Sequence, residues 1–447
     1  MTEQAIGAAI EPNTPLVIQR EHVEAWSLPQ RFAFRVAFIY VVLFFFPLPS
    51  GLSSPDFLSS AFDGVWHRLV PWVGRTFLGL QIANFSNGSG DTLYDWLRIG
   101  TMAAIAILGA VIWSILDRRR ANYATLGGWA HLFLRYAVAI SMVTYGMSKV
   151  IKLQFPTPGY GRLTETYGES SPMGLLWTFM GFSTAYTFFA GASELLGAVL
   201  LFFRRTATLG AIVTALVMLN IALLNFCYDV PVKIGSLHLL FGALLLLIPQ
   251  LRRLFQAVVL GRATPPAPDI GPHFASPAMR GVSFALKVLI VVAVLGTQFS
   301  QALEFKRTFG DRGNPKPPDG WYTVSSLRRD GVELPALATN GDRWQTFVLL
   351  RGYVRLWGFD RSTRLFKIYG DTQHEFVLMP AGDMGEPVAN AHSAGQVRFQ
   401  LAPNGHATLK GTLDGHQIDV AMDRASTKNF PLLKREFHWV SEFPYNR

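Results

Sequence analysis

The sequence predicts a bundle of about seven membrane-spanning helices followed by an all-β domain, a sandwich or a barrel. Two observations predict the bundle. Half of the 447 residues are hydrophobic, with a mean hydropathy of +0.25, and the apolar residues form long runs within residues 32–303. A third observation predicts the β domain over residues 319–447, because from Asp319 apolar and polar residues alternate as in half-buried strands. Residues 1–31 form a mostly polar tail.

The predicted spans are judged against the roughly 20 apolar residues that cross a bilayer as a helix. They are Phe32–Pro47, Leu97–Leu116, Trp129–Val150, Ala185–Phe203, Ala207–Phe226, Gly235–Leu247 and Gly281–Leu303. The run Met173–Phe203 is too long for one span, so we expect a break at Gly181–Thr184. Met173–Phe182 then becomes a short separate helix, with Ser171 as its N-cap and Pro172 at its first position.

The basic residues of the loops predict the orientation. One set of loops is rich in arginine: Arg20, Arg31, Arg118, Arg119, Arg120, Arg204, Arg205, Arg252, Arg253, Arg262 and Arg280. The opposite set is poorer: Arg68, Arg75, Lys152, Arg162 and Lys233. The richer loops are expected in the cytoplasm, so the N-terminal tail is predicted inside and the β domain outside. In the first outer loop we expect an interfacial segment anchored by Trp66 and Trp72.

The β domain begins with three expected strands, residues 344–350, 353–359 and 363–370. Residues 396–402, 407–413 and 416–422 follow as a meander, joined by PNGH and by the Asp414–Gly415 pair. The C-terminal residues 435–447 are dense in aromatic side chains and are expected to pack as a last strand.

Composition excludes several classes of function. The net charge is +10, but the excess lies in short loops between spans, so we predict no nucleic-acid partner. Cys227 is the single cysteine, which excludes a disulfide within the chain and a CxxC redox pair. Any redox chemistry therefore needs an external cofactor. No HExxH, paired-cysteine or DxDxDG pattern occurs, and no metal site is predicted.

Polar residues near the outer ends of the third to sixth spans predict a site. Charged groups within apolar helices usually pair, line a cavity or take part in chemistry. We expect Lys149 as a candidate base, with His238 and Asp229, to form the catalytic set. The ligand-binding candidates are Tyr145, Lys152, Tyr186, Asn220, Asn225 and Tyr228. The alternative is structural: Lys149, Lys152 and Lys233 extend to the lipid headgroups, and Asp229 pairs with one of them.

Two further charges lie deeper in the spans. Arg135 is about six residues into the third span, and Glu194 is at the middle of the fourth. An unpaired carboxylate at that depth is costly. We therefore expect Arg135 and Glu194 to form a structural ion pair, with a neutral, proton-relaying Glu194 as the alternative.

Several long strings resemble the DoxX-like family of polytopic bacterial membrane proteins. They are YGMSKVIKLQFP, SSPMGLLWTFMG, FFAGASELLGAVLLFFRRTATLGA, LNFCYDVPVKIGSLHLL and the closing REFHWVSEFPYNR. The resemblance covers roughly residues 129–254 and implies a four-helix DoxX-like core in a bacterial inner membrane. The wider superfamily includes small subunits of a thiosulfate–quinone oxidoreductase, membrane cargo receptors and vitamin K-dependent glutamyl carboxylases. The carboxylase likeness would make Lys149, which follows Gly146, the catalytic base.

Three hypotheses follow. The chain is a quinone-linked redox protein or subunit that binds a lipophilic quinone as cofactor, with a redox or periplasmic protein partner. Alternatively, it is a non-catalytic protein that binds membrane lipid or cargo, with the β domain as receptor surface. The third hypothesis is a carboxylase-like enzyme with Lys149 as base against a hydroquinone.

Overall fold

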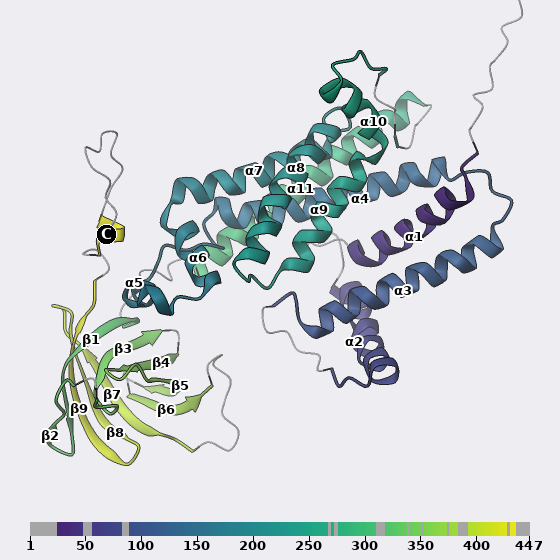
Figure 1. Cartoon of the computed structure of the whole chain (residues 1–447). Helices are drawn as coiled ribbons and strands as arrows, with labels where there is room; N and C mark the ends of the chain where they lie inside the picture. The colour runs from purple at the N-terminus through teal and green to yellow at the C-terminus, as the bar shows by residue number, and fades with distance from the viewer. Residues whose placement is uncertain are drawn as a thin grey trace, which may run out of the picture. The chain divides into compact units, whose positions relative to one another are not determined.

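The computed structural model describes residues 25–47, 56–82, 89–266, 270–271, 276–309, 318–337, 339–350, 352–372, 375–382, 392–426 and 430–434. The main helices precede the strands along the chain (Figure 1). The main helices are α1 (Leu28–Phe45), α2 (Asp56–Leu78), α3 (Leu93–Leu116), α4 (Ala124–Val150), α6 (Pro172–Phe182), α7 (Thr184–Phe202), α8 (Ala207–Cys227), α9 (Lys233–Leu247) and α11 (Pro277–Phe309). Shorter helical segments are α5 (Tyr160–Thr164), η1 (Tyr167–Glu169), η2 (Ile248–Gln250), α10 (Leu251–Leu254), η3 (Phe255–Val259) and α12 (Pro431–Lys434).

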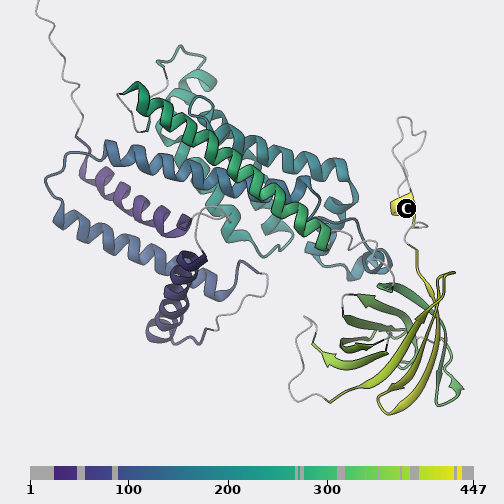
Figure 2. The ribbon, with the colours of Figure 1, turned by 180° about the vertical axis from the view of Figure 1, so that it is seen from behind.

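Within the residues that the structure describes, seven helices are long and apolar enough to cross a membrane, which confirms the predicted bundle. They are α1, α3, α4, α7, α8, the helix that begins with α9, and α11 (Figure 2). Large apolar side chains remain exposed along them, for example Leu116, Leu216 and Val282. Lipid is the solvent that suits such surfaces, so the chain has the character of an integral membrane protein.

Local sequence signals set the helix ends. Ser27 and Gln30 form a capping box at the start of α1, and Thr92 and Asp95 form another at the start of α3. The predicted short helix is confirmed as α6, with Ser171 as N-cap and Pro172 in the first turn. The predicted break is also found, because α6 ends at Phe182 and the Ser183 hydroxyl caps α7.

The chain divides into two compact units. One holds α1, α2, α3, α4 up to Val138, and residues from Phe241 to Lys287. In this unit α1 and α2 pack against α3, and Trp66, Val70 and Met102 form a buried cluster. The predicted anchor Trp66 is therefore a core residue, only 3 % exposed, while Trp72 is 51 % exposed.

The second unit holds α4 from Ala139, α5 to α8, α9 up to Leu240, and residues from Val288 onward. Here α7 packs along α8, and α6 contacts α7. Phe155, Leu176, Met180 and Val230 form a buried cluster that seats α6. The predicted site residues, except Arg135, belong to this unit.

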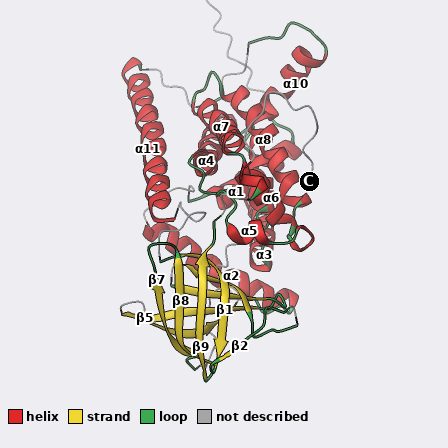
Figure 3. Ribbon diagram, turned by 90° about the vertical axis from the view of Figure 1, so that its left-hand side faces the viewer, coloured by secondary structure: helices red, strands yellow, loops and turns green. Residues whose placement is uncertain are grey.

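The β domain is a closed antiparallel barrel of eight strands (Figure 3). The strands are β1 (Gly320–Arg329), β3 (Trp344–Leu350), β4 (Tyr353–Gly358), β5 (Thr363–Thr372), β6 (Glu375–Ala381), β7 (Gly395–Leu401), β8 (His406–Leu413) and β9 (His416–Arg424). Each pairs with the next, and β1 pairs with β9 to close the ring. A two-residue strand, β2 (Val332–Glu333), pairs antiparallel with the end of β1.

Alternating side chains fill the barrel interior. Its buried rings include Tyr322, Trp344, Phe347, Phe366, Phe376 and Phe399. The six strands predicted from alternation are confirmed as β3, β4, β5, β7, β8 and β9. Residues 435–447, with the predicted aromatic last strand, lie outside the described residues.

Candidate functional site

Two glycines bring a lysine of α4 against a glutamate of α7. A Cβ added to Gly191 would lie 2.7 Å from the carbonyl oxygen of Gly146, and one added to Gly146 would lie 2.9 Å from that of Gly191. The two helix backbones are therefore in direct contact, as small residues allow in membrane bundles. Lys149 is one turn beyond Gly146, and its Cβ would lie 2.8 Å from a Cβ added to Gly191. The lysine side chain therefore begins at this helix contact and reaches Glu194, one turn beyond Gly191.

Lys149 and Glu194 form a buried ion pair. Nζ of Lys149 lies 2.7 Å from Oε1 of Glu194, and the two residues are 6 % and 1 % exposed. Burial of two charges is costly unless their remaining hydrogen-bonding capacity is met. Within the part of the chain that the structure describes, the buried Oε2 of Glu194 accepts no hydrogen bond. Buried carboxylate oxygens in proteins are normally hydrogen-bonded, so this oxygen has acceptor capacity that a ligand can use.

This pairing corrects the prediction that Glu194 pairs with Arg135. The partner of the carboxylate is Lys149, and the Arg135 guanidinium lies 5.6 Å from the ring of Tyr136. Arg135 is buried, as expected for a structural residue. One residue predicted to be catalytic and one predicted to be structural thus form a single site.

Tyr145 lies beside the pair. Nζ of Lys149 is 5.9 Å from the centre of its ring, within the range of a cation–π contact. Tyr145 is 45 % exposed, so it extends from the buried charges to the surface of the helix. Of the predicted ligand-binding residues that the structure describes, Tyr145 is the one that contacts the ion pair, through this cation–π contact.

A third helix, α8, adds a buried hydroxyl near the same stretch of α7. A Cβ on Gly197 would lie 2.6 Å from Oγ1 of Thr214, so α7 and α8 also pack through a glycine. Among the described residues, Oγ1 of Thr214 has no hydrogen-bond partner. Gly197 is one turn after Glu194 on α7. The spacing of Gly191 and Gly197 fits no dimerisation motif, yet each glycine forms its own helix contact.

Asn225 and Asp229 have local roles. Nδ2 of Asn225 donates to the carbonyl oxygen of Val232 at 3.4 Å, which holds the turn between α8 and α9. Asp229, at a positive φ of 49° in that turn, accepts a hydrogen bond from Nζ of Lys233 at 2.9 Å. The Asp229 side chain is 85 % exposed. This geometry supports the structural alternative, in which Asp229 pairs with a nearby lysine.

The other predicted residues are dispersed. Nδ1 of His238 lies 2.7 Å from the carbonyl oxygen of Ile234 in its own helix. Tyr186 packs with Phe179 and Phe189 on the surface, and Asn220 is exposed on α8. Tyr228 packs against the cluster that seats α6. The polar residues at the span ends were expected to form one site. Of the predicted residues within the described ranges, only Lys149, Glu194 and Tyr145 lie together.

Lys152 follows α4 and adopts a positive φ of 60°. Its Nζ donates to Oγ1 of Thr157 at 3.1 Å and to Oγ1 of Thr184 at 2.6 Å. Burial, and secondarily the charge of Lys306, lower the pKa of Lys152. Lys152 thus ties the end of α4 to the start of α7, on the same two helices that carry the ion pair.

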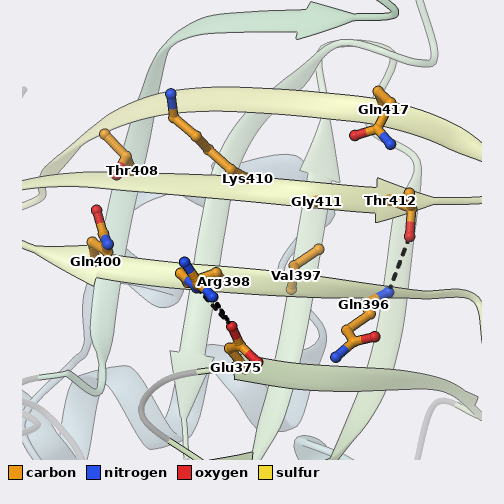
Figure 4. A pocket seen from close by; sticks show the side chains of 10 residues that line it. All are labelled: Glu375, Gln396, Val397, Arg398, Gln400, Thr408, Lys410, Gly411, Thr412 and Gln417. Atoms are coloured by element: carbon orange, nitrogen blue, oxygen red, sulfur yellow. Dashed lines mark hydrogen bonds and ion pairs between the residues drawn. The ribbon is translucent and has the colours of Figure 1, made fainter.

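A polar hollow of about 450 Å³ lies on the outer face of the barrel (Figure 4). Its lining residues are Glu375, Gln396, Val397, Arg398, Gln400, Thr408, Lys410, Gly411, Thr412 and Gln417. Arg398 pairs with Glu375, and Oγ1 of Thr412 accepts from the backbone N–H of Gln396. Gly411, at a φ of 150°, lies among these side chains without one of its own. The sequence analysis predicted no hollow here.

Metal ligands do not gather within the described ranges: no group of three His, Cys, Asp or Glu residues there could hold an ion.

Comparison with known proteins gives one informative relative. A stretch of 115 residues, 25 % of this chain, is 37 % identical to the uncharacterized protein YwoB of Bacillus subtilis and spans 71 % of that protein. No family model matches the chain, and no solved structure matches it.

Proposed function

This chain belongs to the same family as YwoB, and from that premise we propose that it is a membrane protein that binds a lipophilic ligand of the quinone class at Lys149 and Glu194. The single observation that carries the proposal is the buried Oε2 of Glu194, which accepts no hydrogen bond among the described residues. Membership of the DoxX-like family is part of this proposal, resting on the strings quoted above.

The chemistry of the pair suits a quinone and its quinol. A quinol hydroxyl can donate to the free oxygen of Glu194, and a quinone carbonyl can accept from the Lys149 ammonium. Reduction adds two electrons and two protons and converts each carbonyl to a hydroxyl. A lysine and a carboxylate beside the ring can pass those protons. The electrons come from a redox partner, because the single cysteine cannot form a dithiol couple.

The exposure of Tyr145 beside the ion pair supports access for a lipophile. Tyr145, 45 % exposed, lies over the ion pair on a helix apolar enough to span a bilayer. A ring that enters from lipid beside Tyr145 would keep its tail in hydrocarbon and place its oxygens at the charges. The carboxylase-like alternative is less well supported, because Nζ of Lys149 is engaged by a carboxylate 2.7 Å away.

One observation favours a second candidate function, the binding of cargo by the barrel. The polar hollow on the outer face of β6 to β9 offers amide, hydroxyl and charged groups to a polar partner (Figure 4). In that case the barrel is the receptor surface and the bundle is its anchor.

Binding of a short-chain benzoquinone and its quinol to the purified full-length protein in detergent tests the first proposal. We expect both to raise the midpoint of thermal unfolding, and an alkane of matched chain length to leave it unchanged. Glu194→Gln should weaken quinol binding about tenfold or more, since a hydrogen bond to a charged group is lost. Glu165→Gln, which removes a partly buried carboxylate that follows α5 and pairs with Arg162, is the control.

A second variant guards against simple loss of folding. Lys149→Met/Glu194→Gln removes both charges with similar volumes and should fold without binding quinone. Equal quinone binding by this double variant and the wild type would refute the site. The two variants can also be compared for their ability to complement growth. Loss of complementation on deletion of residues 319–447, together with normal complementation by Lys149→Met/Glu194→Gln, would favour the cargo receptor instead.

A further inference from the structure

The turn between α3 and α4 presents three consecutive arginines, Arg118, Arg119 and Arg120. All three side chains are exposed. Among the residues that the structure describes, no carboxylate lies within ion-pair distance of them. Asp117, the nearest acidic residue in sequence, accepts a hydrogen bond from the hydroxyl of Tyr123 at 2.8 Å. The turn therefore carries a concentrated positive charge that its described neighbours do not neutralise.

Two arginines of α1 hold this turn in place. Nη1 of Arg31 donates to the carbonyl oxygens of Arg118 and Arg120, at 3.5 and 2.6 Å. Arg35, only 4 % exposed, donates to the carbonyl oxygen of Asp117 at 3.1 Å and to the hydroxyl of Tyr123. These bonds satisfy carbonyls that the end of a helix leaves open. The backbone that carries the three arginines is therefore fixed before any ligand binds.

Aromatic packing fixes the same region. The Arg120 guanidinium lies 5.6 Å from the centre of the Tyr123 ring, and the Arg35 guanidinium lies 5.1 Å from it. Tyr123 itself is buried and stacks with Phe34 of α1 at 5.3 Å between ring centres. Arg120 is thus oriented, while Arg118 and Arg119 extend from a rigid base.

The surface next to the arginines is strongly apolar. Ile112, Ile115 and Leu116, in the last two turns of α3, are 58 %, 54 % and 80 % exposed. α3 is long and apolar enough to span a bilayer. Within one turn, the exposed side chains change from aliphatic groups to guanidinium groups. The same change, from acyl chains to phosphate groups, occurs at the interface of a lipid bilayer.

We propose that this turn is a binding site for the headgroup of an anionic phospholipid. The phosphodiester would accept paired hydrogen bonds from the planar guanidinium groups, and the acyl chains would lie along Ile112, Ile115 and Leu116. The bound headgroup would neutralise the charge of the turn and anchor α1 and α3 in the leaflet that holds the lipid. The site is independent of the quinone proposal, because it shares no residue with the Lys149–Glu194 pair.

The test compares the full-length protein in detergent with added phosphatidylglycerol or phosphatidylcholine. Phosphatidylglycerol should raise the midpoint of thermal unfolding and remain bound in native mass spectra, whereas phosphatidylcholine should do neither. Arg118→Gln/Arg119→Gln should weaken phosphatidylglycerol binding about tenfold or more, from the electrostatic contribution of two basic residues at an anionic surface. This variant keeps Arg31, Arg35 and Arg120, so the turn stays folded.

The matched control is Arg204→Gln/Arg205→Gln, which removes two exposed arginines after α7. It should retain phosphatidylglycerol binding. Equal weakening by the two double variants would overturn the proposal, because the attraction would then be diffuse. An equal thermal shift with inorganic phosphate alone would also overturn it, since the acyl chains would contribute nothing.

Discussion

The carboxylate of Glu194 is buried among apolar helices, and its counter-charge comes from a neighbouring helix. Sequence placed Glu194 and Lys149 correctly as charges inside spans, but not as partners. Partner choice depends on how α4 and α7 are rotated about their axes, which the alternation of apolar residues does not fix. The contact of Gly146 with Gly191 decides it, and these glycines are far apart in the chain.

Removal of one charge at this pair should be costly. In Glu194→Gln the Lys149 ammonium stays buried without its counter-ion, so we expect a loss of about 3–5 kcal/mol in the free energy of unfolding. The double variant Lys149→Met/Glu194→Gln should recover most of it. Chemical or thermal unfolding in detergent, analysed as a double-mutant cycle, measures the coupling. Additive effects would show that the two side chains do not interact.

Helices and strands were predictable where a local signal sets their ends. The cap Ser171 marked the start of α6, and the Asp414–Gly415 pair marked the β8–β9 turn, where both residues have positive φ. β1 was missed because a bulge between Val324 and Ser326 interrupts its alternation. β6 was missed because EFVLMPA is a nearly continuous apolar run that includes Pro380.

The packing of α4 on α7 should not tolerate a larger residue. In Gly191→Ala the new methyl group would meet backbone atoms of α4 at 2.7–2.8 Å, which no rotamer change relieves. We expect about 1–3 kcal/mol of destabilisation and weaker quinone binding. Gly296→Ala on α11 is the control, because nothing lies within 4 Å of the added atom. A comparable loss in both variants would mean that the helix contact is not tight.

An exposed ion pair between strands makes the barrel sensitive to acid. Arg364 of β5 donates to both carboxylate oxygens of Asp414 in the β8–β9 turn, at 2.6 and 3.0 Å. These hydrogen bonds hold the pKa of Asp414 below its ordinary value. A carboxylate of this kind stabilises the fold above its unfolded pKa of about 4, and the contribution is lost as pH falls through the lower, folded value.

Asp414→Asn should therefore lower the stability of the barrel slightly at neutral pH. It should also make that stability fall less steeply as the pH drops below about 4. Thermal unfolding followed by tryptophan fluorescence between acidic and neutral pH measures this. Asp419→Asn, which removes the exposed partner of Lys410, serves as the comparison. An unchanged acid slope in Asp414→Asn would mean that Arg364 does not hold the turn.

On the scale of the whole molecule, the distribution of arginines predicts an orientation that the fold alone does not fix. The seven apolar helices, an odd number, separate the N-terminal tail from the barrel across the membrane if each of them spans it. We expect the tail in the cytoplasm and the barrel outside. In a Cys227→Ser background, Lys410→Cys on the barrel should react with an impermeant thiol reagent in intact cells, and Arg119→Cys should not. The reverse labelling pattern would invert the topology.

Closure of the barrel joins its first and last strands, since Tyr322 of β1 pairs with Arg424 of β9. Strand β1 leaves the ribosome long before its partner is made. Until β9 arrives, the outer backbone groups of β1 and β8 stay open to other chains. A chain cut short before β9 is therefore expected to self-associate as it is made, even though its helical bundle is already present.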